Sequence, residues 1–156
     1  MAKLSYFAEK RQMNNDPHFF DRLPPDELKR NVKRIIKDIK FDNINDNDYV
    51  YFTNNNIVKL CMQEAYQQYI DALVLTSALH NYIMGDLFRG NTIPGLNIVV
   101  ARNAAANQQV LANAKCQNWL RIYQIFCYID SMPNDVPTIM ATLKQIQNIN
   151  FSVNEL

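Results

Sequence analysis

The distribution of glycine and proline is the feature that most constrains this chain. All three glycines and one proline lie within residues 85–96, whereas residues 57–84 and 97–132 contain neither. Because glycine and proline are the residues that most often interrupt helices, such long uninterrupted segments favour helix. The sequence therefore predicts two long helices, over about 57–87 and 97–130, packed antiparallel as a hairpin.

The apolar residues of the two expected helices indicate how they pack. The face of the second helix has small residues at its start, near Ala101, and large aromatic residues at its end, near Trp119. After Tyr69 the first helix is apolar nearly all round, which predicts neighbours on several sides. The expected face positions are Ile57, Cys61, Leu75, Leu79 and Tyr82 on the first helix, and Ala101, Ala105, Ala112, Cys116, Trp119, Tyr123 and Phe126 on the second.

Shorter segments flank the hairpin. Proline and asparagine break the chain within residues 1–25, which predicts an extended or partly helical arm, and the apolar spacing that follows predicts a helix from about 25 to 40. Residues 41–56 are rich in Asn and Asp, so we expect a loop, with Tyr49–Thr53 as a short strand or extended piece. A final helix is expected over 137–149. Together these elements predict one all-α domain, an elongated helical bundle with an arm over 1–25 and a body over 26–156.

Several classes of protein are disfavoured by what the sequence lacks. The three cysteines form no CxxC pair, so the sequence predicts free thiols, no disulfide framework and no zinc site. The most apolar stretch, residues 69–84, contains Asp71, His80 and Asn81 and is too short to cross a bilayer of about 30 Å. We therefore expect no membrane segment, and residues 1–11 do not resemble a secretion signal.

No set of residues predicts catalysis. The two histidines, His18 and His80, are not in metal-ligand spacing, and the glycines form no phosphate-binding loop. Glu64 and Asp71 are seven residues apart on one expected helix, where they could converge on a ligand. The favoured interpretation is a partnered polar group between helices, with Glu64 buried against a neighbouring helix and Gln68 one turn on. His80 is expected in the core or at an interface. The sequence predicts no enzyme, cofactor or metal.

The strongest polar pattern is a basic face on the helix expected over 25–40. Residues 1–40 contain ten Lys or Arg against six Asp or Glu, whereas residues 41–156 contain six against nine. This face could bind phosphates of a nucleic acid or an acidic protein surface, or it could be the solvated side of an amphipathic helix. The candidate binding residues are Lys29, Arg30, Lys33, Arg34, Lys37 and Lys40.

Two further patterns favour assembly into something larger. Only 12 of the 108 residues from Tyr49 to Leu156 are charged, which lowers the cost of burying their outer faces. In the arm, the adjacent aromatic residues Phe19 and Phe20, with Leu23, are candidate anchors onto this chain's body or a neighbour's. We therefore expect a homo-oligomer or a subunit of a larger particle, with residues 1–25 packed on a neighbour.

In its long hairpin over 57–130, its flanking segments and its Asn-rich composition, the chain resembles small helical virion proteins of tailed bacteriophages, including the ring or adaptor proteins of the portal-tail junction. The resemblance implies a non-catalytic head-to-tail connector that is made in the host cytoplasm, resides in the virion, and assembles with portal, tail or capsid proteins around a DNA channel. It transfers no functional residues. The alternative from another class is a small nucleic-acid-binding regulator that uses the basic helix over 26–40.

Overall fold

The computed structural model describes residues 5–13, 25–86, 98–132 and 135–150. Helices account for 90% of the described residues and no strand occurs among them, which confirms the all-α class. In chain order the elements are α1 (Tyr6–Met13), α2 (Pro25–Lys40), the 3₁₀ helix η2 (Asp46–Thr53), α3 (Asn55–Asn81), the π-helical turn η3 (Tyr82–Asp86), α4 (Ile98–Ser131), α5 (Val136–Lys144) and the 3₁₀ helix η4 (Gln145–Asn148).

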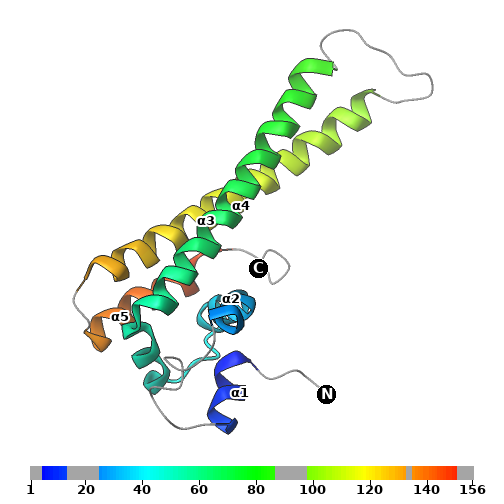
Figure 1. Ribbon diagram of the computed structural model, residues 1–156. Helices are drawn as coiled ribbons and strands as arrows, with labels where there is room; N and C mark the ends of the chain where they lie inside the picture. The colour runs from blue at the N-terminus through cyan, green and yellow to red at the C-terminus, as the bar shows by residue number, and fades with distance from the viewer. Residues whose placement is uncertain (1–4, 14–24, 87–97, 133–134, 151–156) are drawn as a thin grey trace.

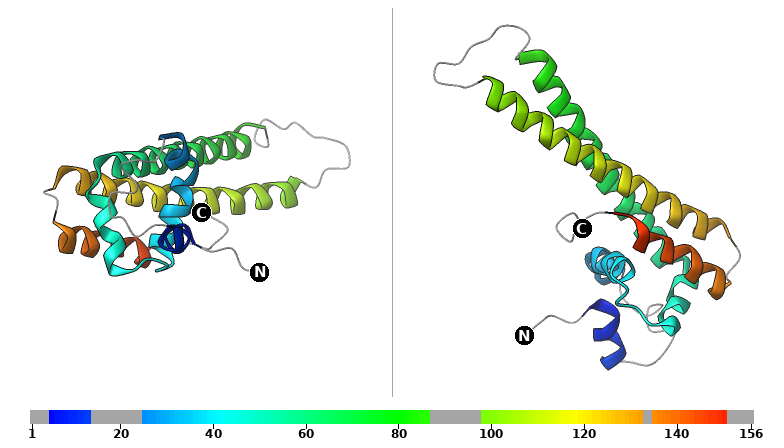
Figure 2. Two further views of the ribbon diagram at one scale, coloured as in Figure 1. Left: turned by 60° about the horizontal axis from the view of Figure 1, so that its bottom comes forward. Right: turned by 180° about the vertical axis from the view of Figure 1, so that it is seen from behind.

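The molecule consists of a compact body and a projection (Figure 1). Helices α3 and α4 lie side by side along their length and run in opposite directions, and this is the most extensive contact between any two elements. The start of α3 and the end of α4 lie in the body with α1, α2, η2, α5 and η4, whereas their other halves extend beyond it (Figure 2). We call the projecting part, residues 72–84 and 100–114, the stalk.

Helix α2 has the bounds that its apolar spacing predicts. Pro25 fixes φ at its first position, the acidic Asp26 and Glu27 lie in its first turn, and Lys37 and Lys40 lie in its last turn, as the helix dipole favours. Its apolar side chains are all buried in the body. They are Leu28, Val32, Ile35, Ile36 and Ile39.

The N-terminal segment is partly helical, which is one of the two forms expected for the arm. Residues 6–13 form α1, and Tyr6 and Phe7 are fully buried in the body of the same chain. The backbone N–H of Phe7 donates to Asp38 Oδ2 of α2 over 2.9 Å. Burial in the core of the same chain stabilises these two aromatic side chains more than exposure on an extended arm would. The expected packing on a neighbour is therefore wrong for Tyr6 and Phe7, whereas residues 14–24 lie outside the described residues.

The short strand considered over Tyr49–Thr53 is also wrong, because this segment is the 3₁₀ helix η2. The backbone N–H of Asn45 donates to Asp48 Oδ2 over 2.8 Å, which holds the start of the turn. With about three residues per turn, Tyr49 and Phe52 lie on one face, and both are buried. The final helix begins at Val136, close to its predicted start, and changes to 3₁₀ geometry at Gln145.

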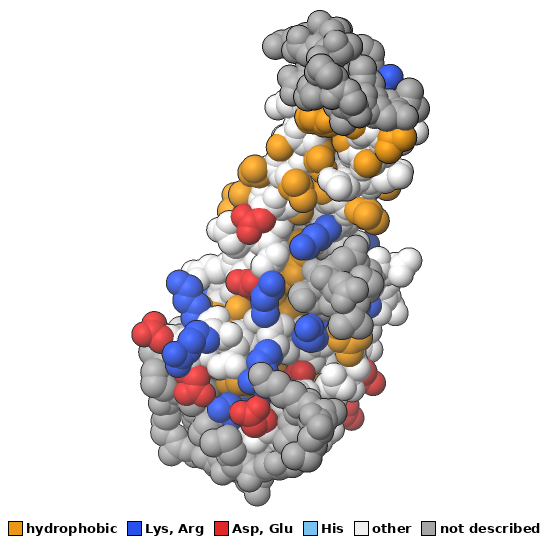
Figure 3. Space-filling model, turned by 90° about the vertical axis from the view of Figure 1, so that its right-hand side faces the viewer, with side chains coloured by type: hydrophobic (Ala, Val, Ile, Leu, Met, Phe, Trp, Pro, Cys, Tyr) orange, Lys and Arg blue, Asp and Glu red, His pale blue; other side chains and the backbone are white. Residues whose placement is uncertain are grey.

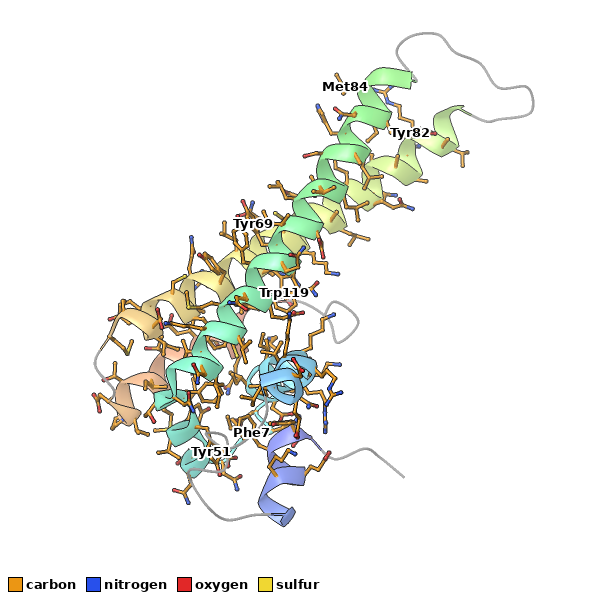
Figure 4. All side chains as sticks on the ribbon, in the orientation of Figure 1. Phe7, Tyr51, Tyr69, Tyr82, Met84 and Trp119 are labelled. Atoms are coloured by element: carbon orange, nitrogen blue, oxygen red, sulfur yellow. The ribbon has the colours of Figure 1, made fainter. Side chains whose placement is uncertain are left out.

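The core lies in the body and not in the stalk. Trp119 of α4 is 0% exposed at the point where the hairpin enters the body (Figure 4). Ile57 and Cys61 of α3 are buried in the same core, as predicted. Aromatic rings join the N-terminal elements to this core, since the centroid of the Phe7 ring is 5.9 Å from those of Tyr51 and Phe52. The body therefore holds one continuous core that includes α1.

Candidate assembly surface

The stalk has almost no core of its own. Its fully buried side chains are three alanines, Ala72 of α3 with Ala105 and Ala112 of α4. Small residues at these positions let the two helices approach closely, which agrees with the taper that the sequence predicts for α4. Since an alanine buries little apolar surface, the two helices contribute little to their own stability where they leave the body.

Large apolar side chains of the stalk point outward instead. Leu75 is 52% exposed and Leu111 is 63% exposed, although an apolar helix in a soluble protein normally buries such residues. The predicted face of the first long helix is therefore wrong at Leu75 and Tyr82. The exposed large apolar residues of the stalk are Leu73, Val74, Leu75, Tyr82, Met84, Val100, Val110 and Leu111.

The same surface carries little charge. Segments 72–84 and 100–114 contain one residue that is charged at neutral pH, Arg102, and one histidine, His80, which is exposed and so lies outside the core. Figure 3 shows hydrophobic side chains gathered over the projecting part of the hairpin, and charged side chains gathered over the body. A gathering of exposed apolar side chains of this kind on a folded chain is typical of a contact site for another macromolecule.

The six predicted basic residues of α2 fall into two groups, three that contact the body and three that are exposed. Arg34 forms an ion pair with Glu9 of α1 (Nη2 to Oε2, 2.8 Å), and its guanidinium lies 5.4 Å from the centre of the Tyr6 ring. Lys40 Nζ donates to the backbone carbonyl of Gln147 over 2.9 Å, and Lys37 is half-buried. Three of the six therefore help to hold the body together or lie against it.

The other three, Lys29, Arg30 and Lys33, are exposed and form no ion pair within the described part of the chain. They lie on one side of α2 with Asp26, and they remain available to a negatively charged partner. The predicted anchors Phe19, Phe20 and Leu23 lie outside the described residues.

The carboxylates that sequence reasoning considered for catalysis do not converge. Glu64 Oε1 accepts from Gln68 Nε2 over 3.0 Å, and Asp71 Oδ1 accepts from Gln67 Nε2 over 2.8 Å. Each carboxylate thus has its own glutamine partner on the same helix. Gln68 is the partner expected for Glu64, but these two bonds lie within α3 and do not join two helices as expected. This arrangement is that of helix-surface pairs one turn apart.

The thiols and cavities offer no stronger site. All three cysteines are free, and burial raises the pKa of the Cys61 thiol, which keeps it protonated. Within the described ranges, no three His, Cys, Asp or Glu side chains gather as a metal site would require. An open hollow of 430 Å³ lies between α4 and α5, lined by residues that include Arg121, Tyr128 and Thr142.

Helices in the described ranges do not combine the length and hydropathy that crossing a bilayer requires. Comparison of the chain with known protein families, with curated proteins and with solved structures gave no match. A functional interpretation therefore depends on the surfaces of the molecule. The stalk is the most unusual of them, because a solitary domain rarely exposes so many large apolar side chains together.

Proposed function

We propose that the protein is a non-catalytic structural subunit that assembles into a larger particle through its stalk. The observation that supports this proposal is the exposure of large apolar side chains on a stalk whose buried residues are alanines. Removal of such surface from water is the main favourable term in association between proteins. Assembly would bury the exposed apolar side chains of the stalk and so stabilise it, whereas in a solitary domain these side chains would stay in water.

The form of assembly that we propose is a virion, with the protein as a head-to-tail connector or ring component in contact with portal, tail or capsid proteins. The division of the surface supports this form. The apolar stalk suits contact between proteins, whereas the exposed Lys29, Arg30 and Lys33 on the body suit contact with DNA at a phosphate backbone. Homo-oligomerisation, as in a ring, is part of this proposal.

Light scattering on the purified protein, alone and mixed with the products of the neighbouring genes, tests the proposal. We expect a defined assembly in at least one mixture, and we expect the chain in purified particles by mass spectrometry. A paired substitution in the stalk, Leu73→Glu with Leu75→Glu, should prevent assembly, because it introduces charge on two sides of α3.

Val50→Glu is the matched control, since Val50 is an exposed apolar residue of the body, in η2, and lies far from the stalk in sequence. It should leave assembly unchanged. A protein that remains a monomer alone and in every mixture would contradict the proposed structural role.

The exposed basic side chains favour a second candidate function, a nucleic-acid-binding regulator that uses α2. This function needs Lys29, Arg30 and Lys33 to be free for phosphate contacts, as they are within the described residues. It does not need the stalk. A monomer that retains DNA in a salt-dependent manner, and whose retention is unaffected by charges in the stalk, would favour this second function.

A further inference from the structure

The exposed apolar residues of the stalk form a row on each helix. On α3 and η3 the row is Leu75, Ala78 and Tyr82, spaced three and four residues apart. On α4 it is Val100, Ala104 and Leu111, spaced four and seven residues apart. Residues at these spacings lie above one another on a helix, and all six side chains are exposed.

The two rows lie on the same side of the hairpin. The inner face of each helix is the one that packs on the other helix of the hairpin. On α4, each residue of the row immediately precedes an alanine of the inner face, and two of these alanines, Ala105 and Ala112, are buried. On the other helix the row likewise precedes the half-buried Thr76, Leu79 and Ile83. One residue turns a right-handed helix by about 100°. Because α3 and α4 run in opposite directions, this equal turn brings both rows to one side, which we call the apolar side.

The opposite side of the stalk has a different character. Residues that immediately follow the inner-facing positions are the exposed polar residues Ser77, His80, Arg102 and Asn113 and the apolar residues Leu73, Met84 and Ala106. The six residues of the apolar side include no ionisable group apart from the phenol of Tyr82, whereas the opposite side includes His80 and Arg102. The exposed Asp71, four residues before Leu75 and next to Ala72, marks the end of the apolar side toward the body.

We propose that a second copy of this chain covers the apolar side, so that two stalks pack as a four-helix bundle. This inference rests on the proposed structural role and names the surface and the partner. A two-fold contact places the same patch on both subunits, and a patch without formal charge is compatible with itself because no like charges are brought together. The alanines allow close approach, while Leu75, Tyr82 and Leu111 supply the large contacts.

The size of the apolar side agrees with contact between copies. The exposed fractions of its four large side chains, Leu75, Tyr82, Val100 and Leu111, correspond to roughly 400 Å² of surface, about half of the ~800 Å² that each partner contributes to an interface of standard size, and the exposed Ala78 and Ala104 add to this area. The row on α4 continues through Asn107, which is exposed and lies three residues after Ala104. A single asparagine within an apolar row is a feature that fixes register and number of helices between packed copies.

Sedimentation equilibrium of the full chain, with variants of adjacent residues, tests this inference. Leu111→Glu introduces charge on the apolar side, whereas Val110→Glu introduces it on the outward face of the same helix, where Val110 is 68% exposed. We expect the wild type and Val110→Glu to self-associate. Leu111→Glu should raise the dissociation constant by about tenfold or more, because burial of one leucine contributes to affinity on this order.

Circular dichroism of each variant should match the wild type, since both substituted side chains are exposed in the single chain. Should Leu111→Glu fold poorly, Leu75→Ala with Leu111→Ala removes the same contacts without adding charge and should again weaken self-association. Equal association of all variants would overturn the inference while leaving assembly intact. A wild type that is monomeric alone but assembles with other proteins would overturn the second copy as partner, yet it would leave the proposed function standing.

Discussion

Replacement of Trp119 by alanine tests whether the core lies where the hairpin enters the body. Trp119 is 0% exposed, and it is the only tryptophan in the chain. A buried tryptophan contributes 150 to 250 Å² of surface, so truncation to alanine removes roughly 150 Å², which corresponds to about 4 kcal/mol at 25 cal/mol per Å². With partial collapse of the cavity that remains, we expect a loss of about 3 to 5 kcal/mol in the free energy of unfolding.

The measurement is urea denaturation followed by far-UV circular dichroism, because the variant has no tryptophan fluorescence. The midpoint should fall while the slope of free energy against urea stays unchanged. Tyr128→Ala is the matched control, since Tyr128 is an exposed aromatic residue of the same helix, and its loss should cost less than about 1 kcal/mol. An equally small cost for Trp119→Ala would refute the placement of the core.

Three further predictions follow from the body of the molecule. Phe7→Ala should destabilise the protein by about 3 to 5 kcal/mol in the same denaturation assay, because α1 belongs to this chain's own core; a cost below about 1 kcal/mol would contradict that placement. Replacement of Lys29, Arg30 and Lys33 by glutamine should weaken DNA retention and reduce its salt dependence by about one unit of slope per lost contact, and unchanged retention would indicate a merely solvated face. Burial raises the pKa of Tyr49 to about 12 in the folded state, so stability present below pH 10 should be lost as the pH rises through 12, and Tyr49→Phe should reduce that loss in urea titrations at several pH values.

The helices themselves could be predicted from local pattern. The apolar spacing and Pro25 gave the bounds of α2, and the absence of glycine and proline gave α4 to within about one residue at each end. These features are determined by neighbours in sequence, because helical hydrogen bonds join residues four apart. The element at Tyr49–Thr53 could not be predicted in this way, since its aromatic residues fit a strand as well as a 3₁₀ turn, and burial of Tyr49 and Phe52 against the body decides between them.

The roles of individual side chains depended on contacts between distant segments. The spacing of α2 placed Arg34 and Lys33 on one basic face, yet Arg34 is bound to Glu9, 25 residues away, and Lys33 remains exposed. The pairing requires α1 to fold back onto α2. Periodicity within α2 contains no information about that contact.

The sequence by itself determined that α3 becomes apolar on nearly every side after Tyr69, and that α4 is lined with small residues opposite it. Only the tertiary structure decided that Leu75 and Leu111 face outward, because it places α1, α2 and α5 around the other end of the hairpin. An apolar side chain is more stable when it is buried, but whether it is buried depends on which other elements of the fold pack against it.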